Sequence, residues 1–464
     1  MSILVWFRRD LRVQDNPALA RAIRDGKTLR LPVIGVYAFD PEGVAGWAPG
    51  GASRWYLDRS LRSLQSQLAD LGIPLHLKRG GVSETIRALA HRLRCERVYW
   101  NRVVEPGQAA VDDAVMRSLT QTGILPKAFD DDCLLMPEQM RRADGSPYRV
   151  FTPFWRRASE ILESADFGER LVPAPQAVAE PLASDPEDVD RLGLLGTHPW
   201  HEKLEKHWSP GEAGALAQWS SFFGDAIVDY DNDRDIPGVP GTSRLSPALH
   251  LGEISVARIY AQCADRLTSE SNEGARASIR RYLSEIGWRD FSRHVLHAWP
   301  DSLNRSLDRR FDRPEAWQAD PDGSRMHAWR RGETGFSLVD AGMRQLWESG
   351  WMHNRVRMVV ASFLTKNLGI HWREGARWFW DTLVDADLPS NTLGWQWVAG
   401  CGTDAAPYYR IFNPDTQAEK FDPQHEYRSR WLGDGLRPAP MLDLKASRQQ
   451  ALSRYQVAIK GQAA

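Results

Sequence analysis

The sequence of 464 residues lacks the marks of several protein classes. Its four cysteines are scattered without a CxxC pair, which disfavours a disulfide framework or a zinc ribbon. The longest apolar stretches, residues 31–39 and 358–364, are too short to cross a bilayer. Arg8, Arg9 and Asp10 interrupt the N-terminus before the apolar core of a signal peptide can develop. We therefore expect a cytoplasmic protein that binds no metal and no membrane.

The sequence also lacks net charge. It contains 59 basic and 60 acidic residues, and the two signs balance in residues 1–200 and in residues 201–464 alike. Proteins that coat DNA non-specifically rely on an excess of positive charge, so that class is disfavoured. Any nucleic-acid site must be a local cluster of basic residues.

The first 130 residues predict an α/β domain. Residues 3–7 form a continuous apolar run typical of a buried parallel strand, and residues 31–37, 75–77 and 98–100 predict further strands. Leucines spaced by three and four over residues 52–71, followed by Gly72, predict an amphipathic helix, and another lies around residues 84–94. This alternation predicts a parallel, doubly wound, Rossmann-like sheet, although the GxGxxG fingerprint is missing after the first strand.

The remaining residues predict a helical domain after a long connection. Residues 171–200 are rich in proline, alanine and acidic residues and show no period, so we assign residues 131–204 to an inter-domain connection. Helical patterns continue from residue 205 to about 430 and again over 444–459. We therefore expect an all-α domain over residues 205–464.

Tryptophan is unusually abundant, with 20 residues against 15 phenylalanines and 11 tyrosines. Most of these tryptophans are expected to build a large aromatic core, because indole rings bury much area and pack well. A chemical role for a few of them needs support from other residues.

One candidate site is the segment before a predicted helix at residue 246. Thr242, Ser243 and Ser246 surround Arg244, so three hydroxyls and a guanidinium can bind phosphate oxygens at a helix N-terminus. The alternative for Ser246 is an ordinary helix N-cap, which the sequence leaves equally open.

A second candidate is a predicted loop with two carboxylates and an amide beside two indoles. It contains Asp385, Asp387 and Asn391, followed by Trp395 and Trp397. These polar groups can bind the hydroxyls and the ring edge of a ligand, and the alternative is a surface turn. A turn alone would not require the flanking tryptophans, which favours a site.

Two predicted helical segments form the third candidate. Tyr282, Glu285 and Arg289 lie on nearly one helical face, with Trp288 one turn from Glu285. The second segment stacks three side chains in the same way: Trp351, Asn354 and Met358. A carboxylate or amide near an indole suits recognition of a base, whereas the alternative is a helix with solvated charges.

Six segments together resemble the photolyase/cryptochrome family. They are LVWFRRDLR at 4–12, the segment 230–246, ExxWR at 285–289, WMHNR at 351–355, NxxGWQW at 391–397 and RIFNP at 410–414. The likeness covers about residues 3–432, and the residues of the substrate pocket resemble those of class I photolyases, which repair cyclobutane pyrimidine dimers in DNA. It implies an antenna domain followed by a helical catalytic domain that holds one FAD in a U-shaped conformation.

The resemblance implies a set of FAD-binding residues from the candidate segments. These are Tyr230, Thr242, Ser243, Arg244, Leu245, Ser246, Tyr282, Glu285, Arg289, Asn354, Arg357, Asp385, Asp387 and Asn391. Within this set Arg357 would pair with Asp385, in the bidentate manner that arginine favours. Asn391 would face N5 of the flavin.

The resemblance also implies the repair chemistry. Excited, fully reduced FAD would donate an electron to a dimer flipped out of the duplex, the ring would split, and the electron would return. Glu285 would bind the lesion base and stabilise the developing charge, with Asn354 and Asn391 as further catalytic residues. The implied DNA-binding residues are Arg234, Glu285, Trp288, Asn354, Arg355, Met358, Trp397, Arg410 and Gln417.

Three indoles match the family's photoreduction row, namely Trp395 nearest the flavin, then Trp372, then Trp317 at the surface. A cryptochrome, which senses light with the same FAD and tryptophans, is the nearest alternative. The complete dimer pocket and the short C-terminal end favour repair. A nucleotide-binding protein built on the α/β domain alone is a further alternative, which the rich helical half disfavours. We expect a monomer that acts on damaged DNA in the bacterial nucleoid.

The second pigment is implied by two residues. Asn101 and Glu105 match positions that bind methenyltetrahydrofolate in folate-type members. The segment at Leu303 and Asn304 lacks the Cys-Lys pair that completes that site. Folate is therefore our first choice, and 8-hydroxy-deazaflavin or an empty site stays open.

Overall fold

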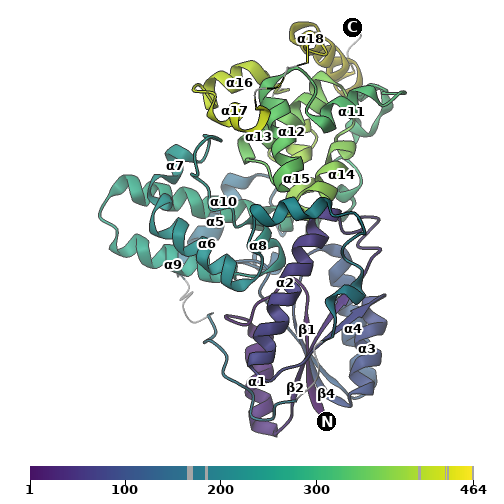
Figure 1. Ribbon diagram of the computed structural model, residues 1–464, viewed down its shortest axis with the longest axis vertical. Coiled ribbons are helices and arrows are strands. Elements are labelled where there is room, and N and C mark those ends of the chain that lie inside the picture. The colour runs from purple at the N-terminus through teal and green to yellow at the C-terminus, as the bar shows by residue number, and fades with distance from the viewer. Residues whose placement is uncertain (165–170, 183–186, 406–408, 434, 436–437, 462–464) are drawn as a thin grey trace.

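The computed structural model describes residues 1–164, 171–182, 187–405, 409–433, 435 and 438–461. An α/β domain forms one end of the molecule, and helices form the rest (Figure 1). The expected fold class is confirmed, because a parallel five-stranded sheet precedes a mostly helical domain. No helix in the described ranges is long and apolar enough to cross a membrane.

The sheet is entirely parallel, in the order β3-β2-β1-β4-β5. Its strands are β1 (Ser2–Phe7), β2 (Val33–Phe39), β3 (Leu75–Arg79), β4 (Cys95–Asn101) and β5 (Leu125–Phe129). Helices cover both faces, so all six residues of the central strand β1 are buried, as its apolar run predicts. The sequence analysis missed β5 because this edge strand is short and partly exposed, with Leu125 60% accessible.

Four helices flank the sheet, two on each face. They are α1 (Pro17–Leu29), α2 (Gly51–Asp70), α3 (Val82–Arg92) and α4 (Pro106–Gln121). Leucines of α2 pack with Ile3, Val5 and Phe7 on one face, and α3 and α4 cover Leu4 and Trp6 on the other. The predicted helix over 52–71 is confirmed, and the following Gly72 has the positive φ (76°) expected of a C-terminal glycine.

The helical domain has two adjoining cores. The first contains α5 (Phe151–Ser164), α6 (Glu212–Gly224), α7 (Tyr230–Asp233), α8 (Ser246–Leu251), α9 (Val256–Ser269) and α10 (Glu273–Ala298). The second contains α11 (Ser324–Arg331), α12 (Ser337–Ser349), α13 (Asn354–Ser362), α14 (Trp372–Thr382), α15 (Leu388–Ala399), α16 (Pro414–Phe421), α17 (Glu426–Leu432) and α18 (Leu444–Tyr455). Two π-helices, η9 (Phe363–Asn367) and η10 (Gln456–Lys460), extend α13 and α18.

Within the described residues, seven short 3-10 helices join these elements. They are η1 (Pro137–Gln139), η3 (Val189–Leu192), η4 (Trp200–Lys206), η5 (Ala226–Asp229), η6 (Pro300–Leu303), η7 (Arg309–Asp312) and η8 (Pro314–Ala316).

Part of the segment expected to connect the domains is folded. Helix α5 lies within residues 131–204, and its Phe151, Phe154 and Leu162 are buried in the first helical core. Residues 165–170 and 183–186 of the same segment lie outside the described residues. The proline-rich stretch lies at residues 171–200, after α5, and the prediction of a connection wrongly included the amphipathic helix that precedes it.

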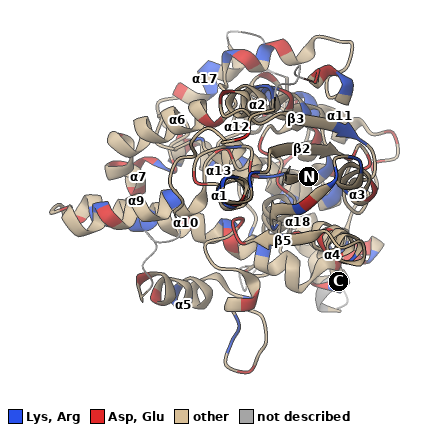
Figure 2. Cartoon of the chain, turned by 90° about the horizontal axis from the view of Figure 1, so that it is seen from below, with Lys and Arg blue, Asp and Glu red and all other residues tan. Residues whose placement is uncertain are grey.

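Acidic and basic residues are interleaved over the helices and loops, as Figure 2 shows. This distribution agrees with the near-zero net charge. A local cluster of side chains is therefore the candidate for an anion site, as the balanced charge predicts.

Candidate functional site

The loop before α8 holds an arginine in an unfavourable conformation. Arg244 has a φ of 51°, a left-handed value that disfavours residues with a side chain. Its guanidinium lies 4.6 Å from the ring centroid of Trp208 and 5.1 Å from that of Trp351. Burial lowers the pKa of Arg244, and its Nε is buried without a hydrogen-bond partner among the described residues. A strained, desolvated cation with an unused donor is suited to an anionic ligand.

Hydroxyl groups lie beside this arginine. The Tyr282 hydroxyl donates to Oγ of Ser243 over 3.2 Å, and the rings of Tyr230 and Tyr282 meet edge to face at 5.2 Å. Ser246 is the first residue of α8, and the cap position falls on Leu245, which makes no side-chain cap bond. The N-cap alternative for Ser246 is therefore wrong, and its hydroxyl is exposed.

The expected pair between Arg357 and Asp385 forms, with 2.8 Å between a guanidinium nitrogen and Oδ2. Oδ1 of the same carboxylate is buried and has no hydrogen-bond partner in the described part of the chain. Arg357 also lies 5.9 Å from the Trp351 ring that Arg244 covers, and the charge of Asp385 acts on Arg244. Arg244, the pair of Arg357 with Asp385, and Trp351 thus form one cluster, which we call the cradle.

Asp387 has a different environment from Asp385. Its carboxylate caps α15 by accepting from the Ser390 amide at 3.0 Å and pairs with Arg293 at 3.0 Å and with His250 at 3.3 Å. Although burial opposes it, the charge of Arg293 and the His250 hydrogen bond hold the pKa of Asp387 well below its usual range. The structure therefore uses Asp387 to fix the start of α15.

Asn391 lies in the first turn of α15, so the prediction that it belongs to a loop is wrong. The reason is the cap at Asp387, which starts the helix four residues earlier. The Asn391 side chain donates from Nδ2 to the carbonyl of Ala376 over 3.0 Å. This bond orients the amide and leaves Oδ1 as an acceptor.

Trp351 precedes α13 instead of lying on it, so the predicted helical stack with Asn354 and Met358 is wrong. Gly350 ends α12 with a φ of 68°, and His353 caps α13 by accepting from the Arg355 amide at 3.2 Å. Asn354, the first residue of α13, is exposed. The break frees Trp351 to turn towards Arg244.

Residues expected to bind DNA form an ion-pair cluster. Arg234 pairs with Glu285, and Arg355 donates to Asp235 over 2.6 Å. Arg234 also lies 3.8 Å from Asp235, which links the two pairs. The arginines expected to hold phosphates are therefore bound to carboxylates here, and phosphate contacts would require an exchange of partners.

An apolar group lies near these charges. The ring of Trp288 stacks on Phe151 with 3.9 Å between centroids and 10° between planes. Trp397 donates from its indole nitrogen to the carbonyl of Asp404 over 3.0 Å, and Arg410 lies 5.9 Å from its ring. The remaining expected DNA residues are half-buried on α13 and α16: Met358 and Gln417.

Arg289 is used inside the protein. Its guanidinium donates to the carbonyl of Asp132 at 2.6 Å, to its carboxylate at 3.2 Å, and to the carbonyl of Leu249 at 3.3 Å. These bonds tie α10 to the segment that follows the sheet. The structure therefore shows a structural role for Arg289, and the flavin contact that the resemblance implied stays a prediction.

The three expected indoles occupy neighbouring elements. Trp395 on α15 packs into the gap left by Gly375 of α14, where a Cβ would overlap its ring. Trp372 begins α14, is fully buried, and donates to Oγ of Ser306 over 3.1 Å. Trp317 is half-buried and donates to the carbonyl of Phe311 over 2.7 Å. Trp395 and Trp372 are therefore buried and Trp317 is partly accessible, which agrees with a place for Trp317 at the outer end of the predicted row.

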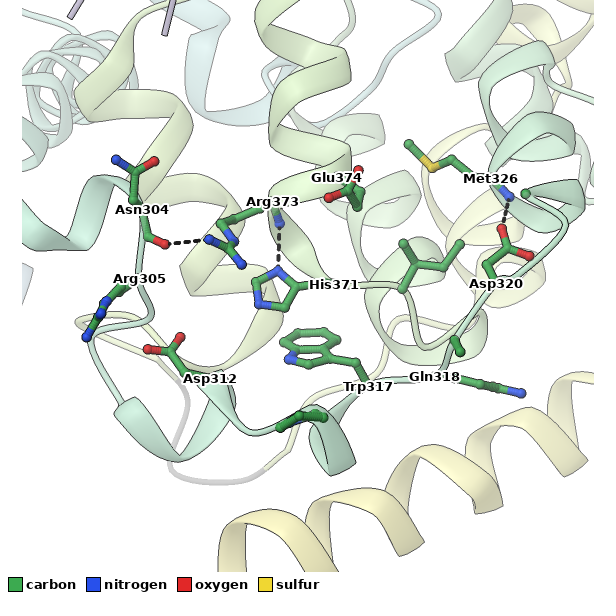
Figure 3. Close-up of a pocket in the computed structure, with 14 residues that line it drawn as sticks. Asn304, Arg305, Asp312, Trp317, Gln318, Asp320, Met326, His371, Arg373 and Glu374 are labelled. Carbon is green, nitrogen blue, oxygen red and sulfur yellow. Dashed lines mark hydrogen bonds between the residues drawn. The ribbon is translucent and has the colours of Figure 1, made fainter. Parts of the chain in front are cut away.

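The sequence analysis missed His371. Its ring lies 4.6 Å from that of Trp317, beside which Figure 3 shows it, and 5.7 Å from that of Trp372, so it contacts both indoles. Its Nδ1 accepts from the backbone amide of Arg373 at 3.1 Å. Burial, aided by Arg373, lowers the pKa of His371 to about 4, so the ring is neutral at pH 7. The sequence signal that could have identified His371 is its position directly before Trp372.

A cavity of about 310 Å³ lies at the carboxyl ends of the strands, between the two domains. Arg9 follows β1, Asp40 follows β2 and Glu105 follows β4, and Trp380 of α14 and Leu388 of α15 line the opposite side. The sheet order reverses direction between β1 and β4, the position where doubly wound sheets bind ligands. A cavity is therefore present at this position of the sheet although the glycine fingerprint is missing.

The two expected antenna residues differ in availability. Glu105 lines this cavity and pairs with Arg9, with 2.8 Å between one nitrogen and Oε2. Asn101 is buried, and its amide bonds Asp10 at 2.7 Å, Asn16 at 2.9 Å and the Ala18 amide at 3.2 Å. The bonds of Asn101 are thus made within the α/β domain.

Comparisons with known proteins identify relatives of the whole chain. A family model described as "DNA photolyase" matches residues 3–177, and one described as "FAD binding domain of DNA photolyase" matches residues 282–437. A deoxyribodipyrimidine photo-lyase of Agrobacterium fabrum is 41% identical over 432 residues, which cover 93% of this chain and 86% of that protein.

Solved structures give the same result. A bacterial class III photolyase from Agrobacterium tumefaciens has a TM-score of 0.89 at 38% identity, covering 99% of this chain and 98% of its own. A Synechocystis cryptochrome has a TM-score of 0.83 at 30% identity, covering 97% and 98%. The expected closeness to class I is not confirmed, because this strongly similar Agrobacterium structure is a class III photolyase.

Proposed function

Because the chain belongs to the DNA photolyase family, we propose that it binds FAD and uses light to repair pyrimidine dimers in DNA. The observation that carries this proposal is the cradle, in which Arg244 and Asp385 each keep one buried polar atom without a partner among the residues that the structure describes. An unused cationic donor beside an unused carboxylate oxygen fits a ligand that has both phosphate oxygens and N–H or hydroxyl groups, as FAD does.

The residues of the cradle would act by binding and orientation. Arg244, with Thr242, Ser243 and Ser246 in the same loop, would hold phosphate and ribityl oxygens, and Asp385 would accept from the flavin edge. Asn391 would present its amide oxygen towards the flavin because its nitrogen is bound to Ala376. When bound and reduced, FAD supplies the light-excited electron for the dimer.

The ion-pair cluster next to the cradle would receive the DNA. Arg234 and Arg355 would exchange their carboxylates for phosphates of the damaged strand, which explains how a neutral protein gains a local basic site. Glu285, released from Arg234, would hydrogen-bond the flipped base and stabilise the charge that develops on it. Trp288 and Trp397 would pack against the dimer. We place this reaction on nucleoid DNA in the cytoplasm, with the protein as a monomer.

The likeness to the Agrobacterium structure supports class III in place of the class I assignment. A cryptochrome role is the second candidate, favoured by the likeness to the Synechocystis structure. The two functions differ in whether light removes dimers from DNA.

A second pigment would occupy the cavity between the domains. Nε of Arg54, which lines it, is buried without a partner among the described residues, and Tyr37 and Trp380 offer aromatic faces. An adjoining cavity of about 480 Å³ shares Glu105 and Leu388. An aromatic ring system with an anionic tail suits these groups, which supports methenyltetrahydrofolate ahead of 8-hydroxy-deazaflavin.

A pair of variants tests the proposed division of roles. Trp372→Phe should slow photoreduction of oxidised flavin at least tenfold and leave repair by chemically reduced protein unchanged. Glu285→Gln, which keeps the side-chain shape, should reduce repair by reduced protein about tenfold or more because one charged contact is lost. Both are measured with a dimer-containing oligonucleotide under blue light. Equal loss of repair in the two pre-reduced variants would contradict the assignment.

A further inference from the structure

The outer end of the tryptophan row opens into a large cavity. This cavity, which we call the Trp317 pocket, has a volume of about 900 Å³ and is lined by Asn304, Arg305, Trp317, Gln318, His371 and Arg373, among others. Figure 3 shows the indole of Trp317 against the imidazole of His371, with the other labelled side chains arranged around them. The Trp317 indole thus lines a solvent-accessible cavity and, through His371, contacts the buried Trp372.

The Trp317 ring is held in a fixed orientation. Its N–H donates to the carbonyl of Phe311 at 2.7 Å, and His371 packs on it at 4.6 Å. Behind His371 lies Trp372, which is fully buried and has no direct access to solvent. A solute that exchanges electrons with this row therefore meets Trp317 first.

The carboxylates that line the pocket are paired with arginines, whereas two of its arginines have no carboxylate partner among the described residues. Its three carboxylates each have an arginine partner: Asp312 with Arg309 at 3.5 Å, Asp320 with Arg325 at 3.3 Å, and Glu374 with Arg377 at 3.8 Å. Arg373 donates to a neutral group, the carbonyl of Asn304, at 2.9 Å. Arg305 is exposed, and no carboxylate of the described residues lies within ion-pair distance of it. The pocket therefore keeps two uncompensated positive charges beside a neutral His371.

We propose that the Trp317 pocket binds a small anionic one-electron donor of the ene-diolate class. A flat, conjugated anion can lie on the accessible part of the half-buried indole while its oxygens face Arg305 and Arg373. A simple thiol is largely neutral at pH 7 and gains little from the two arginines. The inference rests on the proposed tryptophan row.

The redox step balances without a covalent bond. After the row has passed one electron inward, Trp317 is left with one electron too few. The bound ene-diolate anion gives one electron to Trp317, loses one proton to water and leaves as its radical anion. Trp317 returns to its starting state, and the row can deliver a second electron with a second donor.

The experiment measures flavin photoreduction in the FAD-loaded protein at increasing concentrations of L-ascorbate. The rate should saturate, and Arg305→Ser and Arg373→Gln should each raise the half-saturating concentration about threefold to tenfold, since each removes one nearby charge. Raising the salt concentration should weaken the wild-type dependence. The matched control is Arg24→Ser, an exposed arginine of α1 in the other domain, which should leave the curve unchanged.

Two further measurements separate the site from the row. Dithiothreitol, which is uncharged at pH 7, should support photoreduction equally in wild type and both arginine variants. Equilibrium dialysis in the dark should show ascorbate binding to wild type that weakens in the variants. A rate linear in ascorbate, or identical curves in all variants, would overturn the pocket while leaving the row intact. Photoreduction that survives Trp317→Phe with both donors would instead overturn the row.

Discussion

The polar cluster around Asp387 and the one around Asp385 differ in how completely their polar atoms are paired. At the domain junction, Asp387, Arg293 and Asp132 form a continuous network in which each charged group has an opposite partner at about hydrogen-bond distance. In the cradle, Asp385 is buried and Arg244 is half-buried, yet each keeps a polar atom without a partner in the described structure. The complete network stabilises the fold, and the incomplete one is prepared for a ligand.

The comparison explains why neighbouring carboxylates have separate roles. Asp387 is surrounded by cations from both domains, including Arg9 at 3.7 Å. Among the described residues, Asp385 forms an ion pair with Arg357 alone. Removing a member of the junction should therefore change the free energy of unfolding, whereas removing a member of the cradle should change ligand affinity.

The largest effect is expected from breaking the junction. Arg293→Met leaves Asp132 and Asp387 buried without their shared cation and should lower the free energy of unfolding by about 3–5 kcal/mol. Urea denaturation of the FAD-free protein measures the change. The control Arg157→Met removes an exposed arginine of α5 that pairs with Glu160 at 3.1 Å and should change stability by less than ~1 kcal/mol. Equal effects of the two substitutions would refute the structural role of the network.

A second effect at the junction depends on pH. Burial raises the pKa of Glu253 to about 7, although the Ser60 hydroxyl and the Gly211 amide donate to its carboxylate. The folded state therefore keeps this proton at pH values where the unfolded state has lost it. The free energy of unfolding should fall by roughly 3 kcal/mol as the pH rises from about 4.5 to 7, and then level off.

Glu253→Gln should flatten this contribution because the amide does not titrate. Denaturation curves at several pH values between 4 and 8 measure it. The exposed Glu84→Gln serves as the control and should follow wild type. If Glu253→Gln runs parallel to wild type over this range, the buried carboxyl does not carry the proposed proton.

The cradle is tested by Asp385→Asn. This change replaces a charged acceptor by a neutral amide and should weaken FAD binding by about 10- to 100-fold, with little effect on the unfolding of the FAD-free protein. Flavin fluorescence during reconstitution measures the affinity. Asp381→Asn, on the exposed end of α14 where Oδ1 accepts from the Gly51 amide, should bind FAD as wild type does. A stability loss without a loss of affinity would place Asp385 with the junction.

The smallest effect is expected at the DNA cluster, because its arginines already have partners. Arg355→Ala should reduce the slope of log affinity against log salt by about one phosphate contact and weaken damaged and undamaged DNA alike. Binding titrations at four salt concentrations measure this slope, with Arg24→Ala as the control. A loss confined to damaged DNA would give Arg355 a role in lesion recognition instead.

The sequence predicted four of the five strands and the α2 helix, because apolar periodicity is a local signal. The sequence could not show that Asp385 and Asp387 have different partners. Arg293 and His250, which bind Asp387, come from α10 and α8, far away in the chain. It placed Trp351 on a helix because Gly350 was not recognised as a helix end. Pairing of Arg234 with Glu285 also depends on tertiary contacts, so the sequence assigned both residues to ligands and did not predict that they pair with each other.

The central claim is light-driven repair, and one measurement tests it most directly. Protein loaded with FAD and chemically reduced is mixed with an oligonucleotide that carries one cyclobutane pyrimidine dimer, and intact dimer is followed by chromatography under blue light and in the dark. We expect the dimer to disappear only in the light and to be restored to two pyrimidines. Dimer that persists in the light, with reduced FAD demonstrably bound, would contradict the repair function.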